Sequence, residues 1–164
     1  MFILTRVSPV AMYDVEKLDQ NSEDVKKYIE SSREKAPQFM ERYQSYELEK
    51  EMETKLKCHS HKNTIYAFSA EWCPDCYIHI PVLAHIQEKT GLKTRVFGHL
   101  MRDAKSSSRR WRIPPSPDEV ELFDLVKIPS MYIIDNEGNK VGEIIERPSE
   151  GVTLERAVLD ILES

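Results

Sequence analysis

The hydrophobic pattern of the chain changes near residue 63. Before that point, apolar residues recur at helical spacing, whereas Phe2–Val7 is a candidate short strand. Asn21 or Ser22 is a typical cap for a first helix, with acidic residues in its first turn, and Pro37 suits the start of a second helix. The two apolar stripes of the second helix are not aligned, so we expect it to contact two neighbours or to break near Ser45. Residues 1–60 are therefore predicted to form an N-terminal helical extension, mainly two helices packed on the following domain.

From residue 63 onward, short apolar runs alternate with helical patterns. Thr64–Ala70 predicts a buried strand, and Pro74 to about Lys89 predicts a helix that ends at Gly91. Lys93–Leu100 predicts a second strand. Because a strand, a helix and a strand follow one another so closely, the two strands are expected to pair in parallel.

The remainder of the chain predicts a loop, a short helix, a hairpin and a final helix. The loop is rich in Ser, Arg and Pro, and a helix start at Ser116–Glu119 is expected to continue to about Val126. SMYIID and KVGEIIE flank the turn sequence DNEGN, and Thr153 is the expected cap of the last helix. Residues 61–164 are thus predicted to form one α/β domain, with a central mixed β-sheet flanked by helices and an inserted loop near 104–117.

Composition narrows the classes of function. The chain has 164 residues, of which 40% are hydrophobic and 31% charged, which suits one domain with an extension. The formal net charge of −5 argues against a general nucleic-acid binder. No segment approaches the roughly 20 apolar residues that cross a membrane, and the first residues lack the apolar core of a signal peptide. With three cysteines, the chain is not a disulfide-stapled secreted scaffold, and we expect a cytoplasmic protein with no membrane or nucleic-acid partner.

The stretch AEWCPDCYIHIP carries the candidate chemistry. Cys73 lies where a strand passes into a helix, and Pro74 suits the first helical position. Unpaired backbone N–H groups there stabilise a thiolate, so the pKa of Cys73 is expected to fall. Asp75 opposes this effect through its charge, whereas Cys76 lies one turn on, within disulfide reach. The arrangement is typical of thiol–disulfide exchange, in which Cys73 attacks and Cys76 resolves the mixed disulfide.

Two other uses of the cysteines stay open at this stage. A metal site would need Cys73, Cys76 and His79, or the CHSH segment Cys58–His61 brought beside them. The helical drift aims His79 poorly at both sulfurs, and nothing in the sequence joins the two clusters. We therefore expect no metal ligands, with His79 and His85 packed or at the helix surface. The second use left open is that the cysteines are inert and only fill space in the core.

The chain resembles the thioredoxin family over roughly residues 63–163. WCPDC (Trp72–Cys76) resembles the WCxxC active site of that family, in the form found in thioredoxin-related proteins with CPDC in place of CGPC. Pro81 matches the proline that kinks the active-site helix, and Ile128–Ser130 resembles the segment that contains a cis proline. The hairpin and the final amphipathic helix complete the similarity, which implies a thioredoxin-like fold.

The resemblance also implies roles for individual residues. Cys73 is expected to be the exposed nucleophile and Cys76 the resolving thiol. Pro129 is expected to be cis beside the disulfide, leaving the backbone of Ile128 to pair with an extended substrate peptide. Trp72 is expected to shield the site. The supporting residues of the expected site are Trp72, Pro74, Asp75, Ile128 and Pro129.

The expected function is that of a thiol–disulfide oxidoreductase in cell redox homeostasis. It uses a redox-active Cys73–Cys76 disulfide and no other cofactor, acts on protein or small-molecule disulfides, and takes electrons from a donor of thioredoxin-reductase type or another. One position departs from the family, because Ala67 stands where thioredoxins have a buried Asp that deprotonates the resolving thiol. A binding module with little turnover is the alternative that this departure favours. The basic segment Arg109–Arg112 is a candidate for selecting an acidic partner, or else a solvated loop with one packed tryptophan.

Overall fold

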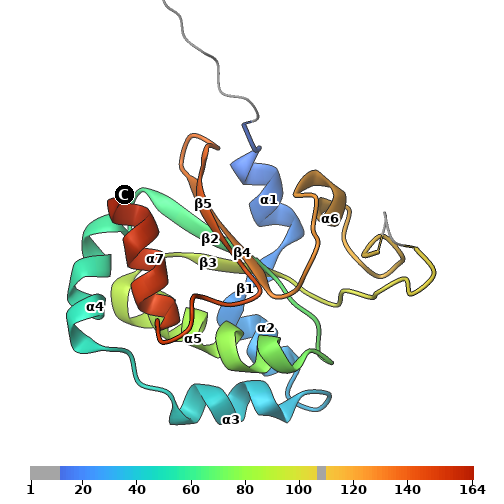
Figure 1. Ribbon diagram of the computed structural model, residues 1–164, viewed down its shortest axis with the longest axis horizontal. Helices are drawn as coiled ribbons and strands as arrows, with labels where there is room; N and C mark the ends of the chain where they lie inside the picture. Colours follow the sequence, from blue (N-terminus) through green and yellow to red (C-terminus); the bar gives the residue numbers. More distant parts are fainter. Residues whose placement is uncertain (1–11, 107–109) are drawn as a thin grey trace, which may run out of the picture.

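A five-stranded mixed sheet forms the centre of the molecule (Figure 1). The computed structural model describes residues 12–106 and 110–164, so the candidate strand Phe2–Val7 lies outside the described part. The strand order is β1-β3-β2-β4-β5. The parallel pair is β2 with β3, and β1–β3, β2–β4 and β4–β5 are antiparallel. The strands are β1 (Glu23–Asp24), β2 (Asn63–Phe68), β3 (Thr94–Phe97), β4 (Ser130–Asp135) and β5 (Lys140–Ile145).

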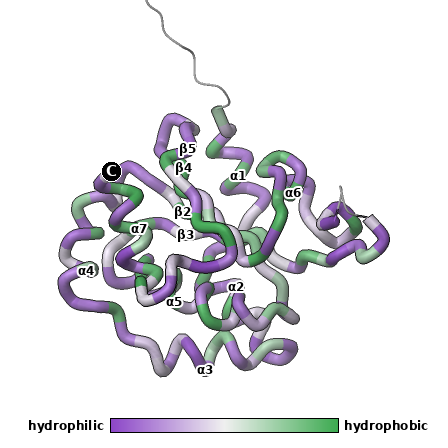
Figure 2. Tube along the Cα trace, in the orientation of Figure 1, coloured by the Kyte–Doolittle hydropathy of each residue, from purple (hydrophilic) through white to green (hydrophobic). Residues whose placement is uncertain are grey.

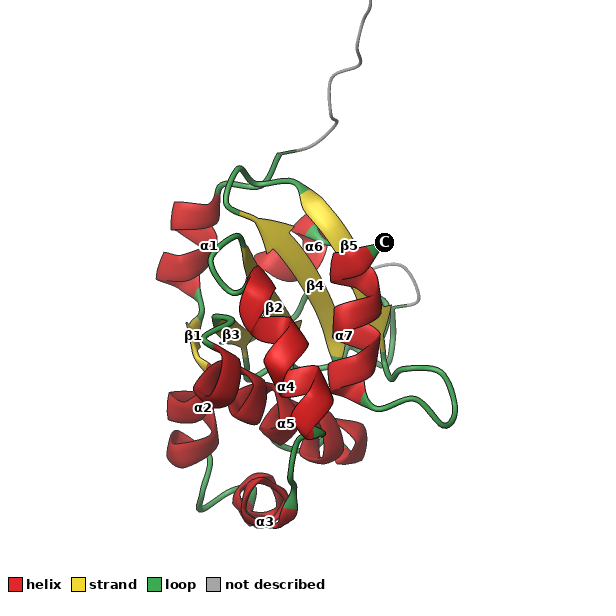
Figure 3. Ribbon diagram, turned by 90° about the vertical axis from the view of Figure 1, so that its left-hand side faces the viewer, coloured by secondary structure: helices red, strands yellow, loops and turns green. Residues whose placement is uncertain are grey.

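Helices lie on both faces of this sheet (Figure 3). They are α1 (Val15–Asn21), α2 (Val25–Ser31), α3 (Pro37–Ser45), α4 (Lys50–Leu56), the 3₁₀ turn η1 (Lys57–His59), α5 (Pro74–Thr90), α6 (Glu119–Leu122) and α7 (Leu154–Glu163). On one face, α7 packs so closely on β5 that a side chain at Gly142 would overlap Ile161. On the other face, the ring of Phe123, just after α6, packs against the rings of Phe68 and Tyr132, with centroids 5.4 and 4.6 Å apart. The predicted α/β fold class, with a parallel first pair and a final hairpin, is confirmed.

The residues before α2 join the sheet, which the sequence did not predict. Glu23 and Asp24 were expected in the first turn of a helix, but they form β1 and pair with Val96 and Arg95 of β3. The guanidinium of Arg95 explains the difference, because it donates to the carbonyl oxygen of Ser22 at 2.5 Å and holds this segment extended along β3. Asp24, rather than Asn21 or Ser22, then caps α2 by accepting from two backbone N–H groups.

The second predicted helix breaks after Ser45, one of the two outcomes expected from its misaligned stripes. The break places Tyr46 and Glu49 beside the first turn of α7. There the fully buried carboxylate of Glu155 accepts from the Tyr46 hydroxyl at 2.7 Å and from the backbone N–H of Glu49 at 3.1 Å. This buried carboxylate joins the α3–α4 connection to the C-terminal helix.

Two predicted elements end earlier than expected. The strand predicted over Lys93–Leu100 stops at Phe97, because the chain turns at Gly98 and His99 takes a positive φ of 63°. The helix predicted to reach Val126 stops at Leu122, and Asp124, with a φ of 50°, leads the chain away. Both turns lie beside the end of β2 where the cysteines follow.

The hydrophobic residues concentrate in the central strands. Every residue of β2 is buried, and β4 is mostly hydrophobic whereas the outer helix α3 is mostly hydrophilic (Figure 2). In the described residues, no helix combines the length and apolar character that crossing a membrane requires.

The buried carboxylate of Glu155 gives a test of this packing. We expect Glu155→Ala to lower the free energy of unfolding by about 1–3 kcal/mol, because it leaves the Tyr46 hydroxyl and the Glu49 N–H without their acceptor. Glu150→Ala, at an exposed position nearby in the chain, is the matched control. Chemical denaturation measures both, and equal stabilities of the two variants would contradict this role for Glu155.

Candidate active site around Cys73 and Cys76

The two cysteines occupy the junction between β2 and α5. Cys73 is the N-cap of α5, and Pro74 takes the first helical position, as the sequence predicted. The backbone N–H of Cys76 donates to Cys73 Sγ at 3.3 Å. Both thiols are free, and Cys73 and Cys76 are 5% and 0% exposed. The expectation that Cys73 is exposed is therefore wrong, because the segment that contains Ile128 lies against its thiol. The helix start therefore directs N–H groups at one sulfur and buries the other behind it.

This geometry moves the two pKa values in opposite directions. Hydrogen bonding from the Cys76 thiol, aided by the backbone N–H of Cys76, lowers the pKa of Cys73 against the opposing effect of burial. The charge of Asp75 raises that pKa, but the N–H groups outweigh it. Burial, followed by the neighbouring Cys73 sulfur, raises the pKa of Cys76 well above its usual value. One thiol is thus prepared to be a nucleophile and the other to stay protonated.

The segment before β4 lies against the first cysteine. The Ile128–Pro129 peptide bond is cis, and the thiol of Cys73 is 3.8 Å from the carbonyl oxygen of Ile128. Both Ile128 and Pro129 are buried. The structure therefore brings together the two cysteines and the Ile128–Pro129 pair, which lie more than fifty residues apart in the chain.

The inserted loop covers another side of the site through its tryptophan. The ring of Trp111 stacks on Trp72 with centroids 6.2 Å apart and an interplanar angle of 13°. Trp111 is nearly buried and donates to the carbonyl oxygen of Val126 at 2.8 Å, whereas Trp72 is 46% exposed. Arg112 forms ion pairs with Asp118 and Glu121, both at 2.9 Å. The loop does flank the site, with its tryptophan packed, and Arg109 lies outside the described residues.

A set of polar residues that the sequence analysis missed lies behind Cys76. The hydroxyl of Tyr28 in α2 is 3.0 Å from Ser69 Oγ and donates to Glu71 Oε2 at 3.1 Å. Glu71 Oε1 is 2.7 Å from Nδ1 of His99. In the sequence, Tyr28 is one member of an apolar helical stripe, and no spacing links it to Glu71 or His99. The pairing of β1 with β3 helps to bring α2, which follows β1 directly, to this place.

The other candidate residues take structural positions. His85 is 2.7 Å from the carbonyl oxygen of Tyr43 and stacks on its ring, so it is a packed histidine. His79 is partly buried, and burial lowers its pKa. Cys58 is exposed in η1. Within residues 12–106 and 110–164, no group of three or more His, Cys, Asp or Glu side chains is placed to hold a metal ion.

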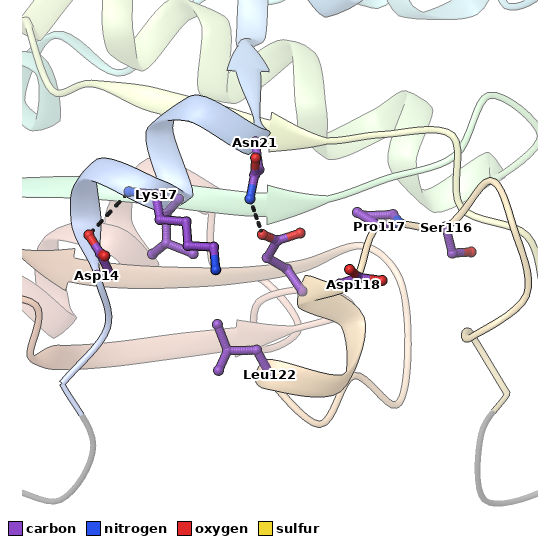
Figure 4. Close-up of a pocket in the computed structure, with 9 residues that line it drawn as sticks. Asp14, Lys17, Asn21, Ser116, Pro117, Asp118 and Leu122 are labelled. Carbon is purple, nitrogen blue, oxygen red and sulfur yellow. Dashed lines mark hydrogen bonds between the residues drawn. The ribbon is translucent and has the colours of Figure 1, made fainter.

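A pocket in the described part of the chain lies apart from the cysteines. It has a volume of about 580 Å³ and lies between α1 and α6 (Figure 4). One side is closed by a hydrogen bond of 2.8 Å from Asn21 to Glu119, and Lys17 also lines it. Neither cysteine is among its lining residues, so the chemistry of the thiols does not involve this pocket.

Comparisons with known proteins identify the family and the fold of the chain. A thioredoxin family model matches residues 22–158, which includes β1 and α2. A solved protein of unknown function from Pseudomonas aeruginosa superposes with a TM-score of 0.64 at 20% identity, over 94% of this chain and 98% of that one. An HIV epitope-scaffold protein superposes with a TM-score of 0.64 at 21% identity, over 93% of this chain and 98% of that one. A thioredoxin pre-protein of Schistosoma mansoni is 18% identical over 70% and 90%, with a TM-score of 0.42. A comparison with curated proteins found no match.

The opposite pKa shifts of the two thiols predict unequal reactivity. In a Cys58→Ser background, we expect iodoacetamide to label Cys73 with a pH midpoint below the usual thiol value of about 8.5, and Cys76 to stay unlabelled at neutral pH. Mass spectrometry of the labelled peptides measures both midpoints.

A pair of variants tests the cause of the low Cys73 midpoint. Cys76→Ala removes the hydrogen-bond donor and should move the Cys73 midpoint to higher pH, because the thiolate loses a stabilising contact. Cys76→Ser keeps a donor and should move it less. Equal midpoints for Cys73 and Cys76 in the parent protein, or no change in Cys76→Ala, would contradict the assignment.

Proposed function

The chain belongs to the thioredoxin family, and on that basis we propose that it is a thiol–disulfide oxidoreductase in which Cys73 attacks and Cys76 resolves. Family membership supports this type of function in general terms. The single observation that carries the specific proposal is the unequal placement of the two thiols at the start of α5, since Cys73 Sγ accepts from the backbone N–H of Cys76 and the Cys76 side chain is fully buried. Unequal thiols suit the two successive attacks of disulfide exchange.

The reaction proceeds in two displacements. The Cys73 thiolate attacks one sulfur of the substrate disulfide, a mixed disulfide forms, and the other substrate sulfur leaves as a thiolate that takes a proton from solvent. Cys76 then loses its proton and attacks Cys73 Sγ, which forms the Cys73–Cys76 disulfide and releases the second substrate thiolate. Two electrons pass from the protein to the substrate. A reduced dithiol donor, of thioredoxin-reductase type or another, restores the two thiols.

A protein disulfide is the substrate class that the surroundings favour. Trp72, Met101 and Val126 are 46%, 41% and 58% exposed, which is high for large apolar side chains. Trp72 donates to the carbonyl oxygen of Leu100, the residue before Met101, and the carbonyl oxygen of Val126 accepts from Trp111, which stacks on Trp72. The three exposed side chains therefore border the same site. An extended peptide that pairs with the backbone before Pro129 would cover this apolar surface. A small disulfide such as that of glutathione leaves most of it exposed.

Disulfide reduction with trapping tests the proposal. With dithiothreitol as donor, we expect the parent protein to accelerate insulin reduction and Cys73→Ser to fall to the rate of dithiothreitol alone, because the attacking sulfur is gone. Cys76→Ser should accumulate a mixed disulfide at Cys73 that mass spectrometry identifies, because nothing resolves it.

The matched control is Cys58→Ser, which removes the exposed cysteine of η1 and should keep the parent rate. The competing function is a binding module with little turnover. It would be favoured by partners that bind a Cys73→Ser/Cys76→Ser variant as tightly as the parent protein, together with no reduction of insulin.

A further inference from the structure

The resolving step of the proposed function raises a question of proton transfer. Cys76 is fully buried, and its thiol must lose a proton before its sulfur can attack. The end of strand β2 offers no acid or base to this thiol, since its last two residues, Ala67 and Phe68, carry only apolar side chains. The proton therefore needs another acceptor or a path to solvent.

A hydrogen-bonded chain of side chains leads from Ser69, beside Cys76, towards the surface. The Ser69 side chain lies next to the Cys76 thiol and acts to lower its pKa against the larger effect of burial. Ser69 Oγ is 3.0 Å from the Tyr28 hydroxyl, and that hydroxyl donates to Glu71 Oε2 at 3.1 Å. Glu71 Oε1 is 2.7 Å from Nδ1 of His99. From Ser69 onward, hydrogen bonds thus connect buried hydroxyls to a carboxylate whose side chain is 15% exposed and to an imidazole that is 51% exposed.

We propose that Ser69, Tyr28 and Glu71 relay the proton of Cys76 to solvent beside His99 when Cys76 attacks the mixed disulfide. This inference rests on the proposed function. Of the three, Ser69 lies next to the reacting thiol, whereas Tyr28 and Glu71 act through Ser69. The relay takes its central hydroxyl from α2, so the segment before β2 becomes part of the resolving step.

The donor directions fit such a transfer. Because the Tyr28 hydroxyl donates to the Glu71 carboxylate, Ser69 donates to the Tyr28 oxygen, which leaves Ser69 Oγ as an acceptor. In the mixed disulfide, Cys73 is no longer a thiolate that takes the hydrogen bond of the Cys76 thiol, so that thiol can donate to Ser69 instead. In the transfer, the thiol proton moves to Ser69, the Ser69 proton to Tyr28 and the Tyr28 proton to Glu71. The Cys76 sulfur keeps the electron pair with which it attacks Cys73. Ser69 then donates to the Cys76 thiolate, and the proton on Glu71 leaves to water.

The charges around Glu71 keep it available as an acceptor. Burial acts to raise the pKa of Glu71, but hydrogen bonds and charge from His99 and the hydrogen bond from Tyr28 outweigh it and lower the pKa. A carboxylate is therefore present at neutral pH. Four other titratable or charged groups face this cluster: Glu23 of β1, Arg95 of β3, Tyr77 of α5 and Cys73. His99 approaches Glu23 at 3.7 Å, and the Tyr77 hydroxyl donates to the backbone oxygen of Glu71.

The packing around Tyr28 fixes the position of its ring and hydroxyl. It is fully buried, its ring lies edge-on to Phe39 at 5.4 Å, and any side chain at Gly98 would overlap it. Burial raises the pKa of its hydroxyl far above the usual value, so it stays protonated and passes protons without ionising. A pocket of about 270 Å³ that is lined in part by His99 and Glu23 gives the outer end of the relay access to water.

Stopped-flow kinetics in a Cys58→Ser background separates the two chemical steps. The reduced protein is mixed with an excess of a symmetric aromatic disulfide whose thiolate is coloured. Attack by Cys73 releases a first coloured thiolate, and resolution by Cys76 releases a second. We expect Tyr28→Phe to leave the first phase unchanged and to slow the second by roughly ten- to hundredfold at neutral pH, because the proton path is cut.

The pH profile distinguishes a relay from a structural effect. The second phase of Tyr28→Phe should rise with pH and approach the parent rate in alkali, where hydroxide takes the proton directly. Glu71→Gln should behave in the same way, and Tyr28→Phe/Glu71→Gln should be no slower than either single variant, because all three break one path.

Tyr66→Phe is the matched control. It removes another buried tyrosine hydroxyl, which donates to Asp19 at 2.6 Å in a different part of the fold, and both phases should keep the parent rates. Unfolding midpoints show that each variant is folded. The relay would be overturned if Tyr28→Phe showed the first phase and a second phase at the parent rate. It would also be overturned if the second phase of Tyr28→Phe were slower than that of the parent by the same factor at every pH. Absence of the first phase in the parent protein would instead overturn the proposed function.

Discussion

The start of α5 is the constraint on which the rest of the site depends. The backbone N–H of Cys76 can donate to Cys73 Sγ only if the helix begins directly at Cys73, and Pro74 permits this by needing no N–H partner of its own. The same start places the side chain of Cys76 one turn on, facing the sheet. A thiolate at the helix end and a thiol in the core are therefore consequences of one backbone junction.

Burial of Cys76 has a cost and a benefit for the proposed chemistry. The buried sulfur stays protonated until a mixed disulfide forms beside it, which prevents it from competing with Cys73 for substrates. The same burial removes it from water. The proposed relay through Ser69 and Tyr28 offsets this cost, and it does so with a residue of α2 that the β1–β3 pairing holds in place.

The fold was largely predictable from the sequence, whereas the site was predictable only in part. Local signals defined Cys73 and Pro74 at the helix start and the final hairpin, because capping and turn chemistry act over a few residues. The two-residue strand β1 carries too little pattern to be recognised, and Arg95, far along the chain, determines it. No sequence pattern marks Tyr28 as a functional residue either, since its partner Glu71 lies forty-three positions away.

A redox titration of the Cys58→Ser protein tests the central claim, that Cys73 and Cys76 form one exchanging pair, most directly. The protein is equilibrated in glutathione buffers of graded potential, and the thiols of each cysteine are counted by mass spectrometry. The account predicts that both thiols disappear together in one two-electron transition, with a slope of about 30 mV for each tenfold change in the equilibrium ratio. Oxidation of Cys73 alone, to a stable mixed disulfide with glutathione while Cys76 stays reduced, would contradict it.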